Sequence, residues 1–267
     1  MKKLKVNYYD SLMTKENNFD PHQAWTMSRA WNPKQMHWIY GGGMGTCAAE
    51  PMRDLPVDDV EVTLFTDKDL LSPMVDRIKT RYKVAYISEC RSIHPFAYHH
   101  ALVVRDKFDF IFTHDKDLLV QDPKFIKNVL GTSWVDDDHA KIYEKTKMLS
   151  HIASSNKWSR GHNLRHIIGD AIKGRYEADY WGSAYKRFDL KTEPLADYRF
   201  SITVMNAEHD NYFTETLVDT FRCGTVPIFW GCSNIGDFFN TKGILKFNKG
   251  ALINAGFKLA ESRKCNY

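Results

Sequence analysis

Four side chains in one stretch of the sequence could bind a ligand that carries both negative charge and hydroxyl groups. Asn206 follows a predicted strand, and Tyr212 lies in the polar loop after it. Thr214 and Glu215 then begin a predicted helix over 214–222. The amino end of a helix favours an anion such as a pyrophosphate, and a carboxylate accepts hydrogen bonds from ribose hydroxyls. The alternative, in which Thr214 and Glu215 only cap the helix, stays open on spacing alone.

Glu89 is an ionisable side chain at a predicted strand end in the first half of the chain. It follows the predicted strand 83–87, and ligands of open parallel sheets bind beyond the carboxyl ends of the strands. A carboxylate at that place is expected to face the ligand-binding cleft. The alternative is a surface ion pair between Glu89 and Arg91. The same rule on strand ends also selects His114, Ser155, Asn156 and Asn206.

Asp115 and Asp117 have the D-x-D spacing with which paired carboxylates can hold a divalent cation. Segments 67–69 and 136–138 show the same spacing, so this Asp-rich chain produces it freely and the signal is weak. The glycine-rich segment 41–45 lacks the G-K-[ST] ending of a phosphate-binding loop and is interpreted as an ordinary loop.

The elements that must position these side chains alternate between strands and helices. Apolar residues with helical spacing predict a helix over 162–173 whose inward face includes Ile167. Pro227 lacks a backbone donor, which predicts that its strand lies toward an edge of the sheet. The strands are predicted at 4–9, 60–65, 83–87, 108–112, 148–153, 198–205, 225–230 and 243–247, and the helices at 72–81, 96–105, 162–173 and 214–222.

Repeated strand–helix–strand units predict an α/β fold with parallel sheets. The pattern occurs in two series, separated by a polar stretch at 136–139. We therefore expect two Rossmann-like parallel-sheet lobes with a cleft between them, an N-terminal lobe over 1–140 and a C-terminal lobe over 141–267.

The composition excludes several classes of protein. The 267 residues include 37 Lys and Arg against 33 Asp and Glu, and this small surplus of +4 does not indicate a nucleic-acid partner. Five cysteines without a C-x-x-C pair argue against a structural zinc site and favour a reducing compartment. The apolar runs are much shorter than the roughly 20 residues of a membrane helix, so no transmembrane segment is expected.

The segment around Asn206 is similar to the donor-binding motif of the family 10 glycosyltransferases, the α-1,3/4-fucosyltransferases. That motif reads E-N, a short loop, Y-x-T-E-K, a helix and then G-x-V-P-x-x-W-G. The matching residues are Asn206, Tyr212, Thr214, Glu215, Gly224, Val226, Pro227, Trp230 and Gly231. Upstream, Ser155 and Asn156 followed by Arg165 resemble the S-N…R segment of the family. The resemblance covers about residues 147–247.

The resemblance implies a GT-B-like enzyme that transfers a sugar with inversion, fucose from GDP-fucose, to a hydroxyl of an acceptor glycan. It implies no required metal ion or other cofactor. Glu89 would be the general base, Arg165 would contact the donor diphosphate, and the first lobe would bind the acceptor. Asn206, Tyr212, Thr214 and Glu215 would form the donor site. Such a protein would be cytoplasmic, or peripheral to a membrane, and of a bacterial or viral type.

Two departures from the family motif leave other functions open. Met205 stands where the family has Glu, and Thr216 stands where it has a phosphate-binding Lys. Arg199, Lys147 and Arg222 are candidates to replace that cation. One alternative is a metal-dependent GT-A-type transferase that uses Asp115 and Asp117. The other is a non-catalytic, carbohydrate-binding descendant of a transferase.

Overall fold

A computed structural model of the chain describes residues 4–9, 36–39, 61–129 and 133–247. The chain divides into two compact units, residues 1–132 (unit 1) and 133–267 (unit 2). Each unit is considered separately below. The glycine-rich segment 41–45 lies outside the described residues.

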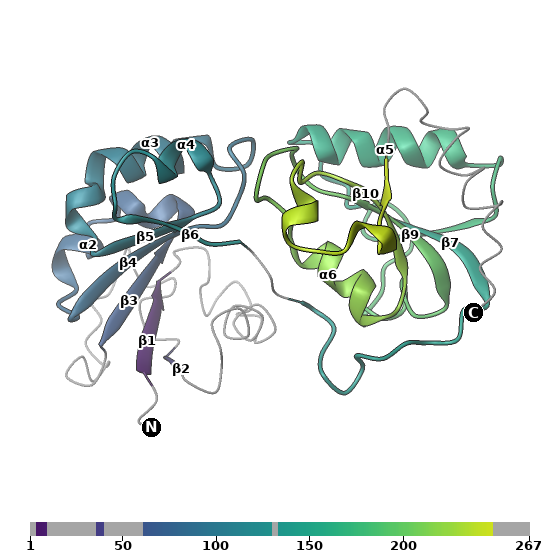
Figure 1. The fold of residues 1–267 in the computed structure, drawn as a ribbon, viewed down its shortest axis with the longest axis horizontal. Coiled ribbons are helices and arrows are strands. Elements are labelled where there is room, and N and C mark those ends of the chain that lie inside the picture. The colour runs from purple at the N-terminus through teal and green to yellow at the C-terminus, as the bar shows by residue number, and fades with distance from the viewer. Residues whose placement is uncertain (1–3, 10–35, 40–60, 130–132, 248–267) are drawn as a thin grey trace. The chain divides into compact units, whose positions relative to one another are not determined.

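Unit 1 contains a six-stranded parallel sheet with the order β2-β1-β3-β4-β5-β6. Figure 1 shows α3 and α4 on one face of this sheet. The strands are β1 Leu4–Tyr9, β2 Met36–Ile39, β3 Val62–Thr66, β4 Tyr82–Ile87, β5 Phe110–Thr113 and β6 Phe125–Lys127. The helices are η2 Asp67–Leu71, α2 Met74–Arg77, α3 Pro95–Val104, η3 Arg105–Lys107 and α4 Lys116–Leu119.

The core of unit 1 forms where the central strands meet α3. Phe65, Ala85 and Ile111, one from each of β3, β4 and β5, are completely buried. Tyr98 and Ala101 of α3 belong to the same cluster. Burial of each large apolar side chain contributes about 1.5–3 kcal/mol, so this cluster holds the carboxyl ends of the three strands in place.

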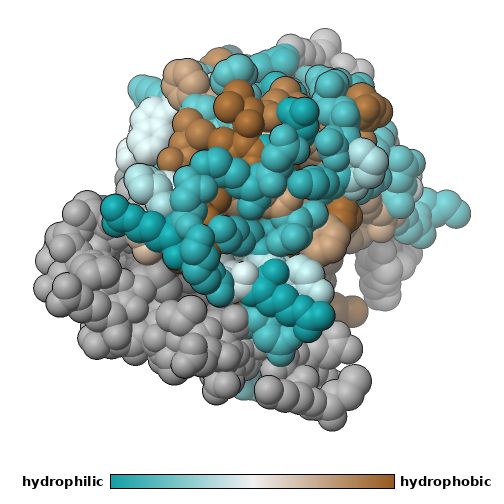
Figure 2. Space-filling view, turned by 90° about the vertical axis from the view of Figure 1, so that its left-hand side faces the viewer, coloured by the Kyte–Doolittle hydropathy of each residue, from teal (hydrophilic) through white to brown (hydrophobic). Residues whose placement is uncertain are grey.

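The surface of unit 1 mixes apolar and polar side chains. Figure 2 shows hydrophobic side chains gathered on part of one face, surrounded by hydrophilic ones. Exposed apolar surface is normal for a folded protein, so it indicates no partner by itself. Among the residues of this unit that the structure describes, the exposed large hydrophobic ones are Leu71, Phe96, Val103, Phe110 and Val120.

Unit 2 contains a five-stranded parallel sheet with the order β11-β10-β9-β7-β8. In Figure 1, α5 and α6 lie on opposite faces of this sheet. The strands are β7 Lys147–Ile152, β8 Ala178–Trp181, β9 Tyr198–Val204, β10 Val226–Trp230 and β11 Leu245–Lys246. The helices are α5 Arg160–Ile172, α6 Glu215–Arg222, η4 Ile235–Asp237 and η5 Thr241–Gly243.

The two parallel sheets with their helices confirm the predicted α/β class, and most predicted strands lie within two residues of the observed ones. The predicted helix 72–81 is wrong: the chain forms the short helices η2 and α2 instead. Ile78 already has extended backbone dihedrals, because the chain must turn there to enter β4. The strands β2, β6 and β8 were not predicted.

Two smaller predictions about side chains and edges are also wrong. Ile167 is 59% exposed, since the buried stripe of α5 runs through Gly161, Ile168 and Ile172 instead. The strand of Pro227 is not at the edge, because β11 pairs with β10. Only Ile228 and Phe229 of β10 pair with β11, so a backbone N–H at position 227, which proline lacks, is not needed for the pairing with β11.

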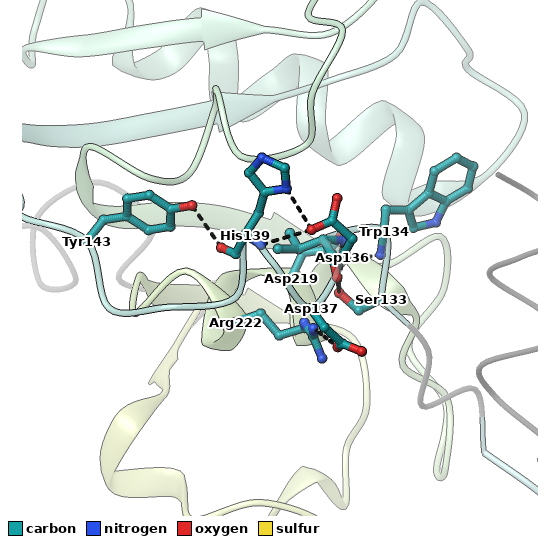
Figure 3. Close-up of polar contacts among 9 residues, drawn as sticks. Ser133, Trp134, Asp136, Asp137, His139, Tyr143, Asp219 and Arg222 are labelled. Carbon is teal, nitrogen blue, oxygen red and sulfur yellow. Dashed lines mark hydrogen bonds and ion pairs between the residues drawn. The ribbon is translucent and has the colours of Figure 1, made fainter. Parts of the chain in front are cut away.

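Residues 133–140, which the sequence analysis assigned to the first lobe, belong to unit 2. The carboxylate of Asp219 in α6 accepts hydrogen bonds from the Ser133 hydroxyl (2.6 Å) and the Trp134 N–H (2.8 Å). Arg222 at the end of α6 pairs with Asp137 (Figure 3). The start of unit 2 is therefore fastened to α6 through side-chain contacts that the sequence pattern did not reveal.

Candidate functional site

Three neighbouring strands of unit 1 end in polar residues. β3 is followed by Asp67, β4 by Ser88 and Glu89, and β5 by His114. The strands are parallel and adjacent, so all of these residues lie at one edge of the sheet. The rule that selected Glu89 and His114 from the sequence also applies to Asp67, which the sequence analysis treated only as part of a chance D-x-D match.

Glu89 is half-buried, and hydrogen bonds hold its backbone on both sides. Its N–H donates to Asp67 Oδ1 at 3.1 Å, and its carbonyl oxygen accepts from the Tyr98 hydroxyl at 2.5 Å. The alternative ion pair with Arg91 is not the observed arrangement. Arg91 instead makes a two-point contact with Asp115, with Nε to Oδ2 and Nη2 to Oδ1 both 2.8 Å.

The Asp115 carboxylate has two structural tasks. It pairs with Arg91, and its Oδ1 accepts hydrogen bonds from the backbone N–H groups of Asp117 and Leu118 at the start of α4. Neighbouring Arg91 and these hydrogen bonds lower the pKa of Asp115 against the effect of burial. In the described ranges, no group of three or more His, Cys, Asp or Glu side chains is placed to hold a metal ion. The partners of Asp115 argue against the alternative metal site at Asp115 and Asp117.

In unit 2, the first turn of α5 packs directly against the end of β9. Gly161 N–H donates to the carbonyl oxygen of Asn206 at 3.0 Å. A Cβ atom on Gly161 would lie only 1.7 Å from the carbonyl oxygen of Met205, so a side chain does not fit at this position. Ser159 begins the helix by accepting a hydrogen bond from the N–H of His162. The amino end of α5 is thus fixed at the carboxyl edge of the sheet.

The structure brings Arg165 and Asn206, two of the predicted donor-site residues, together at the end of β9. Arg165 Nη2 donates to Asn206 Oδ1 at 3.0 Å, and Arg165 Nε donates to the carbonyl oxygen of Val204 at 2.9 Å. The guanidinium therefore fixes the amide of Asn206 and the end of β9. This arrangement makes Arg165 a support for the site as well as a source of positive charge.

Arg160 is a cation at the same edge that sequence reasoning missed. It is the first residue of α5, its guanidinium lies 5.2 Å from the ring centre of Trp230, and its side chain is 52% exposed. Its ion pair with Glu208 is long, at 3.5 Å. Arg160 follows Ser155 and Asn156 more closely than Arg165 does, and this spacing was the available signal.

The loop between β9 and α6 is held in an unusual backbone conformation. Asn211 has a φ of 60°, a left-handed conformation that Asn tolerates better than most residues. Its N–H donates to Asn234 Oδ1 at 2.7 Å, and Asn234 Nδ2 donates to Asn211 Oδ1 at 3.0 Å. Tyr212 is 1% exposed, so it shapes the loop from within.

Thr214 precedes α6, but its hydroxyl does not cap the helix. Its N–H lies 3.3 Å and its Oγ1 3.6 Å from the sulfur of Met205, and Oγ1 also lies 3.5 Å from Thr216 Oγ1. The simple capping alternative therefore fails for this side chain. The two positions that depart from the family motif, Met205 and Thr216, contact the same threonine.

Glu215 begins α6 as a half-buried carboxylate. Burial raises its pKa, while the nearby Lys191 ammonium acts in the opposite direction. Thr216 Oγ1 donates to Glu215 Oε1 at 3.2 Å. A carboxylate held in this way can accept hydrogen bonds from ligand hydroxyls at the start of the helix.

The three cations suggested as replacements for the missing lysine lie elsewhere. Lys147 begins β7 and pairs with Asp179 at 3.1 Å, and Arg199 lies near the start of β9. Both positions are at the amino ends of the strands. Arg222 is the last residue of α6, about 10 Å along the helix from Glu215. These three suggestions are wrong, because parallel topology separates the two ends of each element.

Two parallel sheets with their helices are the arrangement of the GT-B fold, and solved structures with that fold are similar to this chain over 97% of its length. A fucosyltransferase structure titled "Crystal Structure of alpha1,3-Fucosyltransferase with GDP-fucose" covers 97% of this chain and 78% of its own, with a TM-score of 0.56 at 14% identity. An α-glucosyltransferase in complex with UDP and a 13-mer DNA covers 97% and 89%, with a TM-score of 0.61 at 12% identity. At these identities, the likeness shows the fold.

The sequence of unit 2 is similar to one family in particular. Residues 142–249 match the model of glycosyltransferase family 10 (fucosyltransferase), C-terminal part. The α-(1,3)-fucosyltransferase FucT of Helicobacter pylori is 33% identical over 55 residues, which are 21% of this chain and 12% of that enzyme. The resemblance found from the motifs is confirmed for residues 142–249, the part of the chain that the family model matches. No helix within the described ranges has both the length and the apolar character needed to cross a membrane.

Proposed function

We propose that this chain is an inverting glycosyltransferase that moves fucose from GDP-fucose to a hydroxyl of an acceptor glycan. The single observation that carries the proposal is the group of side chains at the carboxyl edge of the unit 2 sheet. There, Arg165 holds Asn206, and Arg160 and Thr214 lie at the amino ends of α5 and α6. The α-1,3/4 specificity is part of the proposal and is supported by distant relatives alone.

The donor diphosphate would bind at the amino ends of α5 and α6. Helix amino ends present free N–H groups and positive dipole charge to an anion. We propose that the exposed guanidinium of Arg160 contacts the diphosphate directly. Arg165 would act on the donor indirectly, because it fixes the side-chain amide of Asn206. Glu215 would accept hydrogen bonds from hydroxyl groups of the donor.

Glu89 would act as the general base in unit 1. Its carboxylate takes the proton of the acceptor hydroxyl while that oxygen attacks the anomeric carbon and the bond to the diphosphate breaks. GDP leaves with the electron pair, and inversion follows from a single displacement. General-base catalysis of this kind contributes typically about 10²–10⁴-fold in rate. We propose that no metal ion is required, which is supported by the engagement of Asp115 with Arg91.

The test is a comparison of transfer and donor binding in Glu89→Gln. We expect transfer of fucose from GDP-fucose to fall by at least about 10²-fold, because the amide does not accept the proton. The affinity for GDP, measured by calorimetry, should stay within about twofold. In Arg160→Ala, by contrast, we expect the affinity for GDP itself to fall. Full transfer activity in Glu89→Gln would remove Glu89 from its role.

A second candidate function is supported by Met205 and Thr216. Both replace charged residues of the family motif by uncharged ones, which favours a carbohydrate-binding protein without turnover. The two functions differ in one measurement, the release of GDP from GDP-fucose in the presence of glycan acceptors. Release that disappears in Glu89→Gln supports the enzyme, and binding of donor or glycan without any release supports the binding protein.

A further inference from the structure

Asp67 is a buried carboxylate at the end of β3, and it lies beside the segment that carries Glu89. Its side chain accepts three hydrogen bonds from two consecutive residues. Oδ1 accepts from the N–H of Ser88 at 3.0 Å and from the N–H of Glu89 at 3.1 Å, and Oδ2 accepts from the Ser88 hydroxyl at 2.7 Å. Asp67 is only 6% exposed, so these bonds are largely shielded from water.

The register of the sheet explains why this contact forms. β3 and β4 are parallel neighbours, and Thr66 pairs with Tyr86. Asp67 therefore leaves β3 next to the point at which β4 ends. Backbone N–H groups beyond the last ladder pair need acceptors, and the Asp67 carboxylate supplies them.

A second group of side chains holds the same segment from the other side. The Tyr98 hydroxyl in α3 donates to the carbonyl oxygen of Glu89, and it lies 3.3 Å from His114 Nε2. The Arg91 guanidinium covers the Tyr98 ring at 4.4 Å from its centre, and Arg91 is fixed by Asp115. The N–H and the carbonyl oxygen of Glu89 are thus both fixed by buried side chains.

The burial of Asp67 has an electrostatic cost. Burial raises the pKa of Asp67, while the hydrogen bonds from Ser88 and Glu89 and the charge of His94 act in the opposite direction. A carboxylate that keeps its charge in this place depends on those hydrogen bonds. The hydrogen bonds therefore stabilise the charged Asp67 carboxylate and at the same time fix the backbone of Ser88 and Glu89.

We propose that Asp67 is a positioning residue for the general base: it fixes the backbone of Ser88 and Glu89 so that the Glu89 carboxylate has one defined place. This inference rests on the proposed role of Glu89. A base acts only within hydrogen-bond reach of the proton it removes, and a displacement of about 1 Å can cost about 10²-fold in rate. Asp67 makes no contact with the reacting atoms in this account.

The experiment compares Asp67→Asn and Asp67→Ala with Asp109→Asn. Asp109 is a matched control, because its carboxylate also accepts from a backbone N–H of β4, that of Lys83, but at the amino end of the strand and at the surface. For each variant, kcat, the KM for GDP-fucose and the calorimetric Kd for GDP are measured, and kcat is expressed per molecule that binds GDP. This correction removes unfolded protein from the comparison.

We expect kcat to fall about 10-fold in Asp67→Asn and about 10²-fold in Asp67→Ala, with KM and Kd within about twofold of the unsubstituted protein. Asp109→Asn should leave all three unchanged. If Asp67→Ala does not fold, Asp67→Asn tests the charge of the acceptor in all three bonds, and Ser88→Ala removes the hydroxyl bond to Oδ2 alone. A normal kcat per folded molecule in the Asp67 variants would overturn the inference.

Glu89→Gln separates this inference from the function on which it rests. If Glu89→Gln abolishes transfer while the Asp67 variants keep a normal kcat, only the positioning role of Asp67 fails. If Glu89→Gln keeps full activity, the proposed base fails, and the inference fails with it. Parallel losses of kcat in Glu89→Gln and in the Asp67 variants, with GDP binding intact, support both.

Discussion

Each unit has a buried aspartate that holds a neighbouring segment through a serine. In unit 1, Asp67 accepts from the hydroxyl of Ser88 and from two backbone N–H groups. In unit 2, Asp219 accepts from the hydroxyl of Ser133 and from the N–H groups of the two residues that follow it. The local chemistry is the same, but only Asp67 holds a segment at the carboxyl edge of a parallel sheet.

The surroundings of the two aspartates differ in charge. Lys191 lies 3.6 Å from Asp219 and neutralises it, whereas Asp67 relies on hydrogen bonds and on His94. Asp219, paired with Lys191, holds the start of unit 2 against α6, which is a structural role. The two contacts therefore differ both in their charge partner and in their position in the sheet, and these two features distinguish the structural role of Asp219 from the positioning role proposed for Asp67.

The largest expected effect is on stability, in Asp219→Ala. The substitution leaves Lys191 and the Trp134 N–H without their buried partner, and we expect the free energy of unfolding to fall by about 3–5 kcal/mol. Urea unfolding of the full chain measures this. Asp179→Ala is the control, because Asp179 also pairs with a lysine and accepts from a hydroxyl but is exposed, so a loss within about 1 kcal/mol is expected. Equal losses in both variants would contradict the account.

Acid should destabilise unit 2 through His151. Burial lowers the pKa of this completely buried side chain to about 4 from an ordinary value of 6.5. Between pH 6.5 and pH 4 the unfolded chain binds a proton that the folded chain does not, so stability falls as the pH falls, by up to about 3 kcal/mol. Asp67 in unit 1 has a raised pKa, so its protonation does not add to this loss.

The measurement is urea unfolding at several pH values between 4 and 7. In His151→Leu we expect a weaker pH dependence, and the remainder belongs in part to His162, whose pKa burial also lowers to about 4. The exposed His139 provides the control, since His139→Gln should keep the full dependence. An unchanged pH dependence in His151→Leu would show that its titration does not govern acid stability.

The smallest expected effect concerns the missing cation of the donor site. Thr216→Lys adds an ammonium group beside Glu215 at the start of α6, where we expect the affinity for GDP to rise about 10-fold. This is less than a full charged hydrogen bond of about 1.5–3 kcal/mol, because Glu215 competes for the new cation. Calorimetry with GDP measures the change, and Thr241→Lys, outside the site, is the control. Weaker binding in Thr216→Lys would indicate a site rebuilt around threonine.

The sequence predicted most strands and helices of both sheets, because the spacing of the apolar residues and the length of each apolar segment distinguish strands from helices. It predicted β9 and α6 almost to the residue, since Phe200, Ile202 and Val204 alternate and Gly224 ends the helix with a φ of 66°. It missed β8 at 178–181, since only Trp181 of this edge strand is buried and the apolar pattern is weak.

The candidate site was predictable in part. Asn206 was expected at a strand end and lies there, in contact with Arg165, and the role of both residues in donor binding stays a prediction. Asp67 and Arg160 were missed for different reasons. The importance of Asp67 depends on the register of β3 and β4, which residue type and spacing do not give. Arg160 was missed because Arg165 was assigned to the motif, although Arg160 follows Ser155 and Asn156 more closely.

Hydrogen exchange of the full chain with and without GDP tests the central claim most directly. The account predicts that GDP slows exchange in two stretches of unit 2, the start of α5 around 159–163 and the segment 206–217, and that Arg160→Ala removes much of this protection. UDP and CDP should give less protection than GDP. No slowing in these stretches at saturating GDP, or equal slowing with Arg160→Ala, would contradict the placement of the donor and with it the proposed transferase.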